Sequence, residues 1–142
     1  MYIVSACLLG DNVKYNGGNN YTEKVVEFLK DKEYITVCPE VEGGFPCPRD
    51  PAERVGDLIL NKKGKDITEP FISGARRCAE RVTETVPLDQ IDGAILKARS
   101  PSCGEGVIYD GTFSGVLIRG DGVFTEILKE LGIRVITELD LK

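Results

Sequence analysis

The chain has 142 residues, of which 42% are hydrophobic and 29% are charged, so its size and composition are those of one folded domain rather than a disordered segment. Its 18 Lys and Arg residues and 23 Asp and Glu residues give a formal net charge of -5, which argues against bulk nucleic acid or an anionic membrane as the main partner. No apolar run has the length of a membrane span, and the N-terminus lacks the basic region and cleavage site of a signal peptide, so we expect a cytoplasmic protein with small-molecule partners.

The first third of the chain alternates predicted strands and helices. Residues 2–5 are apolar and largely β-branched, which predicts a short buried strand, and a polar stretch rich in Gly ends it. Residues 22–29 predict a helix, with Thr22 at its N-cap and apolar residues at helical spacing. Residues 34–37 predict a second strand, which ends where a proline removes a backbone donor. From 39 to 53 the density of Pro and Gly predicts a long functional loop with neither helix nor strand.

The rest of the chain continues this alternation. Residues 54–67 predict a small hairpin or an irregular excursion, and residues 68–85 predict the longest helix, with one apolar stripe. Residues 93–96 predict a third buried strand. After a second glycine-rich loop, residues 123–131 predict a helix closed by the following glycine, and residues 133–136 predict the last strand.

Strands separated by helices predict a mainly parallel sheet with helices on its faces. We therefore expect residues 1–142 to form a single α/β domain with a Rossmann-like, three-layer α/β/α fold. In an open parallel sheet, ligands bind at the edge where the carboxyl ends of the strands lie. Side chains that directly follow the strands are thus the first candidates for a site.

The sequence has no His, which removes several kinds of active site. Without imidazole there is no Ser-His-Asp or Cys-His nucleophile pair and no histidine-ligated zinc. Any general base must be a carboxylate, Lys, Tyr or a thiolate.

Five cysteines are present, and an odd number in a cytosolic chain argues against a disulfide framework. Cys7, Cys38 and Cys103 each lie at, or a few residues after, the end of a predicted strand, so we expect them to converge at one edge of the sheet. Cys78 lies in the middle of the long helix on its apolar stripe, which indicates core packing. Cys47 lies between two prolines, where it is a fourth metal ligand, a bystander or a small filler of a rigid loop.

Converging thiolates suit a soft metal centre. Structural zinc needs four ligands, a set that Cys47 would complete, and iron–sulfur clusters are usually held by four Cys. A cluster held by only three Cys leaves one iron open, and an open iron in a sulfur environment favours a sulfur-containing substrate. The residues alone leave two alternatives to such an enzyme. These are a structural zinc domain that uses Cys7, Cys38, Cys47 and Cys103, and a sulfur or cluster carrier without catalysis.

Four motifs occur along nearly the whole chain. In order they are Val4-Ser5-Ala6-Cys7-Leu8-Leu9-Gly10, Cys38-Pro39-Glu40-Val41 with Gly43-Gly44, Pro48-Arg49 with Ala52-Glu53, and Ser100-Pro101-Ser102-Cys103-Gly104. Together they resemble the DUF523 family, whose characterised members are thiouracil desulfidases, and the short length resembles the family's stand-alone form. The resemblance implies a 4Fe-4S cluster held by Cys7, Cys38 and Cys103, with the substrate sulfur on the open iron. It also implies Glu40 and Ser100 as the catalytic carboxylate and serine.

The implied reaction is a non-redox, hydrolytic desulfuration of thiolated uracil, as the free base or a nucleotide, which releases hydrosulfide and the uracil product. In it Glu40 orients or deprotonates the attacking water, and Ser100 relays a proton or positions the substrate. The alternatives are that Glu40 only caps its loop and that Ser100, which precedes a proline, is only a turn residue. Cys47 departs from the family pattern and is a candidate to block the open iron. Four cations near the same loops are candidates to contact a nucleotide phosphate: Lys14, Arg49, Lys97 and Arg99.

Overall fold

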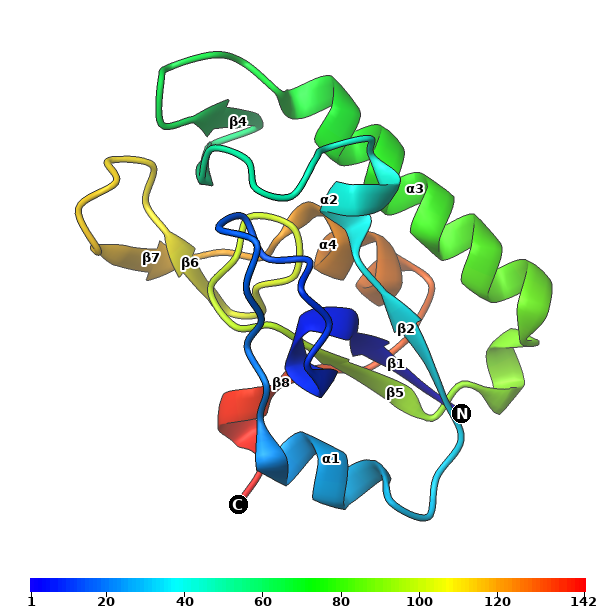
Figure 1. Ribbon diagram of the computed structural model, residues 1–142. Coiled ribbons are helices and arrows are strands. Elements are labelled where there is room, and N and C mark those ends of the chain that lie inside the picture. Colours follow the sequence, from blue (N-terminus) through cyan, green and yellow to red (C-terminus); the bar gives the residue numbers. More distant parts are fainter.

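A four-stranded parallel sheet forms the centre of the computed structural model, which describes residues 1–142 (Figure 1). In the order β2-β1-β5-β8, its strands are Tyr34–Val37, Tyr2–Ser5, Gly93–Leu96 and Val135–Thr137. All neighbouring pairs run parallel, and Ile3 of β1 lies opposite Ile35 of β2 and Ala94 of β5. The prediction of a mainly parallel sheet is confirmed.

Helices cover both faces of this sheet. α1 (Glu23–Leu29) packs on one face, and α3 (Thr68–Thr85) and α4 (Val123–Glu130) pack against each other on the opposite face (Figure 1). Because successive strand residues point to opposite faces, Ile3 joins the core under α3 and α4, and Val4 joins the smaller core under α1. The predicted arrangement of helices on both sides of a parallel sheet is therefore present.

The long helix α3 has the bounds that the apolar periodicity predicts. Its buried stripe includes Phe71, Ala75, Cys78 and Val82, each at most 2% exposed. The prediction that Cys78 is a core residue is thus confirmed, since its thiol packs in the main hydrophobic cluster.

The segment after β2 contains more regular structure than the sequence predicts. α2 (Pro39–Glu42) is a single helical turn that begins with proline, whose missing N–H is not needed at that position. β3 (Ala52–Val55) pairs antiparallel with β4 (Leu58–Asn61). The prediction of neither helix nor strand between 39 and 53 is therefore wrong at both ends. The hairpin alternative for 54–67 is correct, although its first strand begins earlier.

A second hairpin occupies the predicted glycine-rich loop. β6 (Val107–Tyr109) pairs antiparallel with β7 (Leu117–Arg119), and every residue of β7 is exposed. An exposed strand has no alternating apolar pattern, so periodicity gives no signal there. Near the C-terminus the differences are small, because α4 ends at Glu130 rather than at residue 131 and β8 begins at Val135 rather than at residue 133.

Three short 3-10 helices complete the fold. They follow β1, α3 and β8, and they are Ala6–Leu9, Leu88–Gln90 and Glu138–Asp140. The first of them continues directly from the carboxyl end of β1, so it places its residues at the edge of the sheet where the loops after β2 and β5 also begin.

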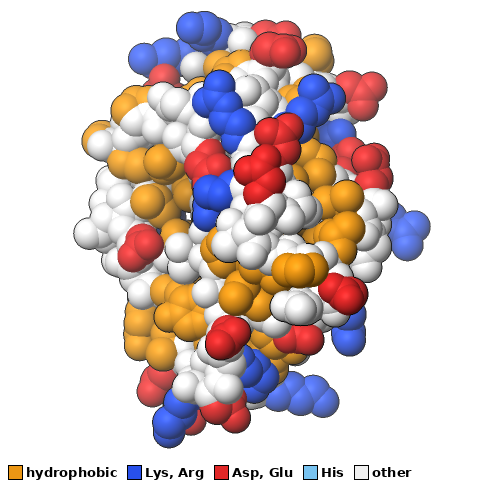
Figure 2. Space-filling model, turned by 90° about the vertical axis from the view of Figure 1, so that its right-hand side faces the viewer, with side chains coloured by type: hydrophobic (Ala, Val, Ile, Leu, Met, Phe, Trp, Pro, Cys, Tyr) orange, Lys and Arg blue, Asp and Glu red, His pale blue; other side chains and the backbone are white.

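The surface carries charges of both signs. Figure 2 shows a face on which basic and acidic side chains lie interspersed among apolar ones, without a continuous field of one sign. None of the helices combines the length and the apolar character needed to cross a bilayer.

Candidate functional site

A cavity of about 560 Å³ lies at the carboxyl-terminal edge of the parallel sheet. Its walls come from the residues that follow β1, β2 and β5 and from the two hairpins. Ser5, Val37 and Lys97 line it, and each lies at or next to the end of a sheet strand. This is the edge at which ligands bind in open parallel sheets.

Three cysteines reach this cavity from three different loops. Cys7 lies in the 3-10 helix after β1, Cys38 is the N-cap residue of α2 after β2, and Cys103 lies in the loop after β5. All three are free thiols, and Cys103 is only 5% exposed. The structure therefore brings together the three cysteines that the sequence analysis singled out.

Burial determines how these thiols ionise. Desolvation raises the pKa of Cys38 to about 11 and that of Cys103 to about 12, and it also raises the pKa of Cys7. The Asn20 amide opposes this shift at Cys7, because its Nδ2 donates to Cys7 Sγ at 3.4 Å. Neighbouring thiolates would repel one another, so the group stays protonated until a metal centre supplies positive charge.

The cysteine arrangement fits a cluster better than a single ion. No group of three or more Cys, Asp or Glu side chains is arranged to hold one metal ion. Zinc binds its thiolates at about 2.3 Å, which requires sulfurs about 3.8 Å apart in a tetrahedral site. In an iron–sulfur cluster the thiolates bind different iron atoms, so their sulfurs lie farther apart around a shared core than in a one-metal site. Three free thiols that line one cavity without forming a one-metal site are consistent with such a ligand set.

Cys47 lies apart from this set. Its side chain is exposed and does not line the cavity, and Arg49 Nη1 donates to its Sγ at 3.0 Å. A four-cysteine zinc site that includes Cys47 has no support in this geometry. Cys7, Cys38 and Cys103 are thus the only cysteines that line the cavity.

Glu40 brings a carboxylate to the same cavity. It lies in the single turn α2, two residues after Cys38. Its Oε1 accepts a hydrogen bond from Arg49 Nε at 3.1 Å, and its Oε2 accepts one from Ser102 Oγ at 2.8 Å. The carboxylate is therefore held from two sides, by residues from two other loops.

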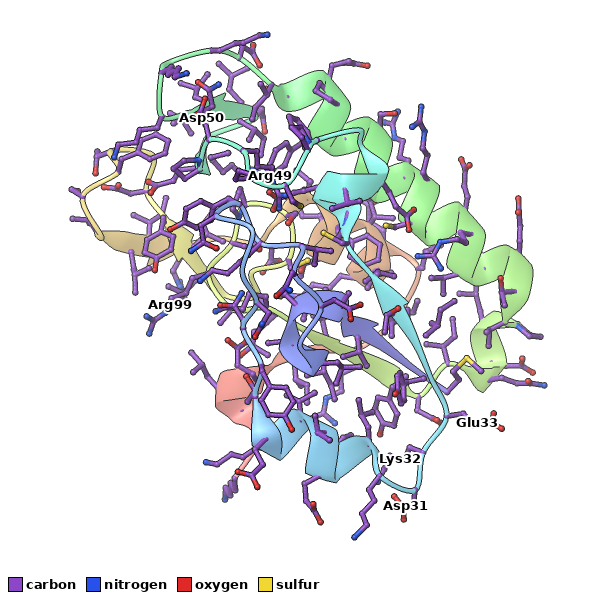
Figure 3. All side chains as sticks on the ribbon, viewed as in Figure 1. Asp31, Lys32, Glu33, Arg49, Asp50 and Arg99 are labelled. Atoms are coloured by element: carbon purple, nitrogen blue, oxygen red, sulfur yellow. The ribbon has the colours of Figure 1, made fainter.

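Arg49 anchors the loops around Glu40. Its side chain is 7% exposed, its Nη2 donates to the carbonyl of Val13 at 2.9 Å, and its backbone N–H donates to the carbonyl of Tyr15 at 2.6 Å. Burial acts to lower the pKa of Arg49, but the Glu40 carboxylate raises it above its usual value. In Figure 3, Arg49 lies among the loops between α2 and the β3–β4 hairpin. Arg49 therefore pairs with the Glu40 carboxylate. The contact with a nucleotide phosphate that the sequence analysis suggested for Arg49 stays a prediction.

Two serines of the last motif have different surroundings. Ser100 lines the cavity, and its Oγ accepts a hydrogen bond from the backbone N–H of Cys103 at 2.8 Å, as a turn residue does. Ser102 is 2% exposed and is the serine that contacts Glu40. The two hydroxyl oxygens lie 3.5 Å apart. The sequence reasoning missed Ser102, although its place beside Cys103 in the same motif was an available signal.

The remaining predicted cations divide into two groups. Lys14 and Lys97 line the cavity, and Lys97 Nζ forms an ion pair with Glu138 at 2.8 Å. Arg99 is exposed, is not part of the cavity wall, and extends away from the molecule in Figure 3. Lys62, which the sequence analysis did not consider, is a further cation at the cavity wall.

Comparisons with known proteins agree with one another. The model of a family described as 2-thiouracil desulfurase matches residues 2–140. The uncharacterized protein YbbK of Bacillus subtilis (strain 168) is 40% identical over an alignment 151 positions long, gaps included, which covers 99% of this chain and 97% of that protein. The solved structure of a [4Fe-4S]-dependent thiouracil desulfidase, TudS (DUF523Vcz), is 41% identical and matches with a TM-score of 0.87, over 99% of this chain and 91% of that one.

Proposed function

Because the chain belongs to the 2-thiouracil desulfurase family, we propose that it is a [4Fe-4S]-dependent thiouracil desulfidase in which Cys7, Cys38 and Cys103 bind the cluster. The observation that carries this proposal is that three free cysteines from three strand ends line one cavity. Two carboxylates line the same cavity, Glu40 and Glu53, and Glu40 is the one held by Arg49 and Ser102. The pair of a soft metal site and a fixed carboxylate supports metal-assisted hydrolysis of a carbon–sulfur bond.

The overall reaction exchanges sulfur for oxygen. Water supplies the oxygen of the new carbonyl group, and the sulfur leaves as hydrosulfide. One proton of the water accompanies the sulfur and the other passes to a base and then to solvent, so no electron is gained or lost. When bound, a cluster held by three thiolates supplies one iron with a free coordination position, a Lewis acid suited to a thiocarbonyl sulfur.

Glu40 is the base in this proposal. Each carboxylate oxygen can accept two hydrogen bonds, so Oε2 has room for a water molecule beside the hydroxyl of Ser102. Arg49 on the other oxygen keeps the carboxylate pointed at the cavity. Glu40 takes the proton of the attacking water at this position, as a chain without His requires of a carboxylate.

Ser100 supplies a second hydroxyl to the cavity, 3.5 Å from that of Ser102. Its oxygen already accepts from the Cys103 backbone, which leaves its own hydrogen free to donate. This supports a role in positioning the substrate or passing on a proton. The substrate is a thiolated uracil, as free base or nucleotide, and Lys14 and Lys62 at the cavity wall are the cations available to a phosphate.

Purification without oxygen tests the proposal. We expect about four iron and four sulfide per chain, together with sulfide release and uracil formation from 2-thiouracil. Cys103→Ala should lose the iron, and Cys47→Ala, the matched control outside the cavity, should retain it. A protein that contains one zinc and no iron, or an iron-loaded protein that leaves 2-thiouracil unchanged, would overturn the proposal.

A further inference from the structure

The β6–β7 loop, residues 110–116, forms part of the cavity wall. Phe113 and Gly115 line the cavity. The loop is closed by a hydrogen bond from the Asp110 backbone N–H to the Val116 carbonyl at 3.0 Å, and Asp110 Oδ1 accepts from the Thr112 backbone N–H at 2.9 Å. The segment therefore has a defined conformation over the site.

Phe113 adopts a backbone conformation that disfavours bulky side chains. Its φ is +57°, in the left-handed region, where a residue such as phenylalanine is rarely found. Such strain persists only where the surrounding structure imposes it, and it concentrates at sites that hold ligands. The aromatic ring is half-buried and faces the cavity that also contains the cysteines.

Glu53 of β3 imposes this conformation. Its side chain is 9% exposed, and its Oε1 accepts from the backbone N–H groups of Gly111 and Phe113, both at 3.0 Å. Hydrogen bonds to an ionised acceptor are roughly twice as strong as neutral ones. The loop is also packed closely on β3, since a Cβ at Gly111 would lie 2.3 Å from Val55 Cγ2. Glu53, in the Ala52-Glu53 motif, thus fixes the conformation of the β6–β7 loop, a role separate from the proposed chemistry.

The cavity wall combines aromatic and polar side chains. Tyr15 and Tyr109 line the cavity together with Phe113, and Glu40, Glu53 and Ser100 are among its polar lining residues. A planar pyrimidine presents a π-face that stacks on aromatic rings. We propose that Phe113 is the stacking surface for the pyrimidine ring and that Glu53 is the positioning residue that holds it there, an inference that rests on the proposed function.

Truncation of the ring tests the first half. Phe113→Ala should raise the KM for 2-thiouracil roughly 5- to 100-fold with kcat largely retained, because base stacking is worth about 1 to 3 kcal/mol. Phe113→Tyr should restore the KM, and Tyr34→Ala, an exposed aromatic outside the cavity, should not change it. A KM within twofold of wild type for Phe113→Ala overturns the proposal.

A double-mutant cycle tests the second half. Glu53→Gln removes the charge but not the volume, and we expect it to raise the KM as Phe113→Ala does. If Glu53 acts through Phe113, the double variant should bind no more weakly than Phe113→Ala alone. Glu126→Gln, on a surface ion pair with Arg54, is the control. A Glu53→Gln variant that melts at a lower temperature with an unchanged KM would assign Glu53 to stability alone. A double variant whose two effects on KM multiply would show that Glu53 acts on binding independently of Phe113, and either result overturns this half of the proposal.

A binding measurement separates this inference from the proposed function. Calorimetry with uracil requires no turnover and can be done on protein prepared without iron. If wild type binds uracil in a Phe113-dependent way but releases no sulfide from 2-thiouracil when iron-loaded, the inference stands and the proposed function fails. If wild type releases sulfide and Phe113→Ala changes neither KM nor uracil affinity, the function stands and the inference fails.

Discussion

Ser102 Oγ donates a 2.8 Å hydrogen bond to Glu40 Oε2 across 62 residues of sequence. This contact joins the loop that carries Cys103 to the helical turn that follows Cys38. It places the carboxylate between two of the three cysteine loops, with Arg49 on its second oxygen. The general base of the proposed reaction is therefore oriented by residues from two other loops.

Replacement of Glu40 should separate catalysis from cluster binding. Glu40→Gln keeps the size of the side chain and leaves the three cysteines in place, but it removes the base, so we expect kcat to fall roughly 10²- to 10⁴-fold with normal iron content. Turnover of 2-thiouracil and iron per chain are the measurements. Glu42→Gln, which removes an ion pair with Arg81 outside the cavity, should keep its activity. Full activity of Glu40→Gln with an intact cluster would instead favour a sulfur or cluster carrier.

Loss of the Ser102 hydroxyl should affect kcat more than KM. Ser102→Ala leaves Glu40 Oε2 without its donor, and a hydrogen bond to a charged group contributes about 1.5 to 3 kcal/mol, so we expect roughly a tenfold or larger drop in kcat. Ser102→Thr keeps the hydroxyl and should recover most of the rate. Steady-state kinetics on both variants, with melting temperatures recorded alongside, check this. Equal losses in the Ala and Thr variants would mean that packing, not the hydrogen bond, is what matters at this 2% exposed position.

Arg49→Lys should weaken both the fold and the reaction. The guanidinium contacts Glu40, the Val13 carbonyl and the Pro46 carbonyl through different nitrogens, and a single ammonium group cannot reach all of them. We expect the free energy of unfolding to fall by about 1.5 to 3 kcal/mol, because the mostly buried Glu40 carboxylate loses a guanidinium hydrogen bond. Denaturant titration measures this, with Arg76→Lys on the exposed side of α3 as control. If Arg49→Lys unfolds at the same denaturant concentration as the wild type, the stability of these loops does not depend on the guanidinium group.

The pKa shifts predict an order of alkylation in protein prepared without iron. A raised pKa means a smaller thiolate fraction at a given pH, and thiolate is the reactive form. At pH 8 iodoacetamide should therefore modify exposed Cys47 first, and it should leave Cys38 and Cys103 largely intact, since burial raises the pKa values of these two to about 11 and about 12. The reaction of Cys38 should accelerate as the pH approaches 11. Peptide mapping by mass spectrometry gives the order, and modification of Cys103 as fast as Cys47 would contradict it.

The sequence predicts the core elements better than the loops that build the site. α3 and β5 have the expected bounds because each shows a complete apolar pattern, a stripe in the helix and a continuous run in the strand. The convergence of Cys7, Cys38 and Cys103 also follows from the sequence, since parallel strands end at one edge. The contact between Ser102 and Glu40 does not, because it depends on how two irregular loops fold over that edge. The sequence does not predict α2 either, because a single helical turn among Pro and Gly residues is too short to show the periodic spacing of apolar residues that marks a helix.

The close packing of α2 on α3 gives a last prediction. A Cβ at Gly74 of α3 would lie 2.1 Å from the carbonyl oxygen of Pro39 and 2.6 Å from the backbone nitrogen of Gly43. Gly74→Ala must therefore push α2 outward, and overpacking of this kind costs about 1 to 3 kcal/mol.

The same displacement moves the residues that α2 brings to the cavity. Cys38 is the N-cap of α2 and Glu40 lies in its first turn, so we expect Gly74→Ala to lower both iron content and kcat in addition to the melting temperature. Arg76→Ala, an exposed substitution in the same helix, should leave all three unchanged. Iron analysis, kinetics and thermal denaturation on the two variants make the comparison. A Gly74→Ala protein that melts lower but keeps full iron and kcat would show that the site tolerates movement of this turn.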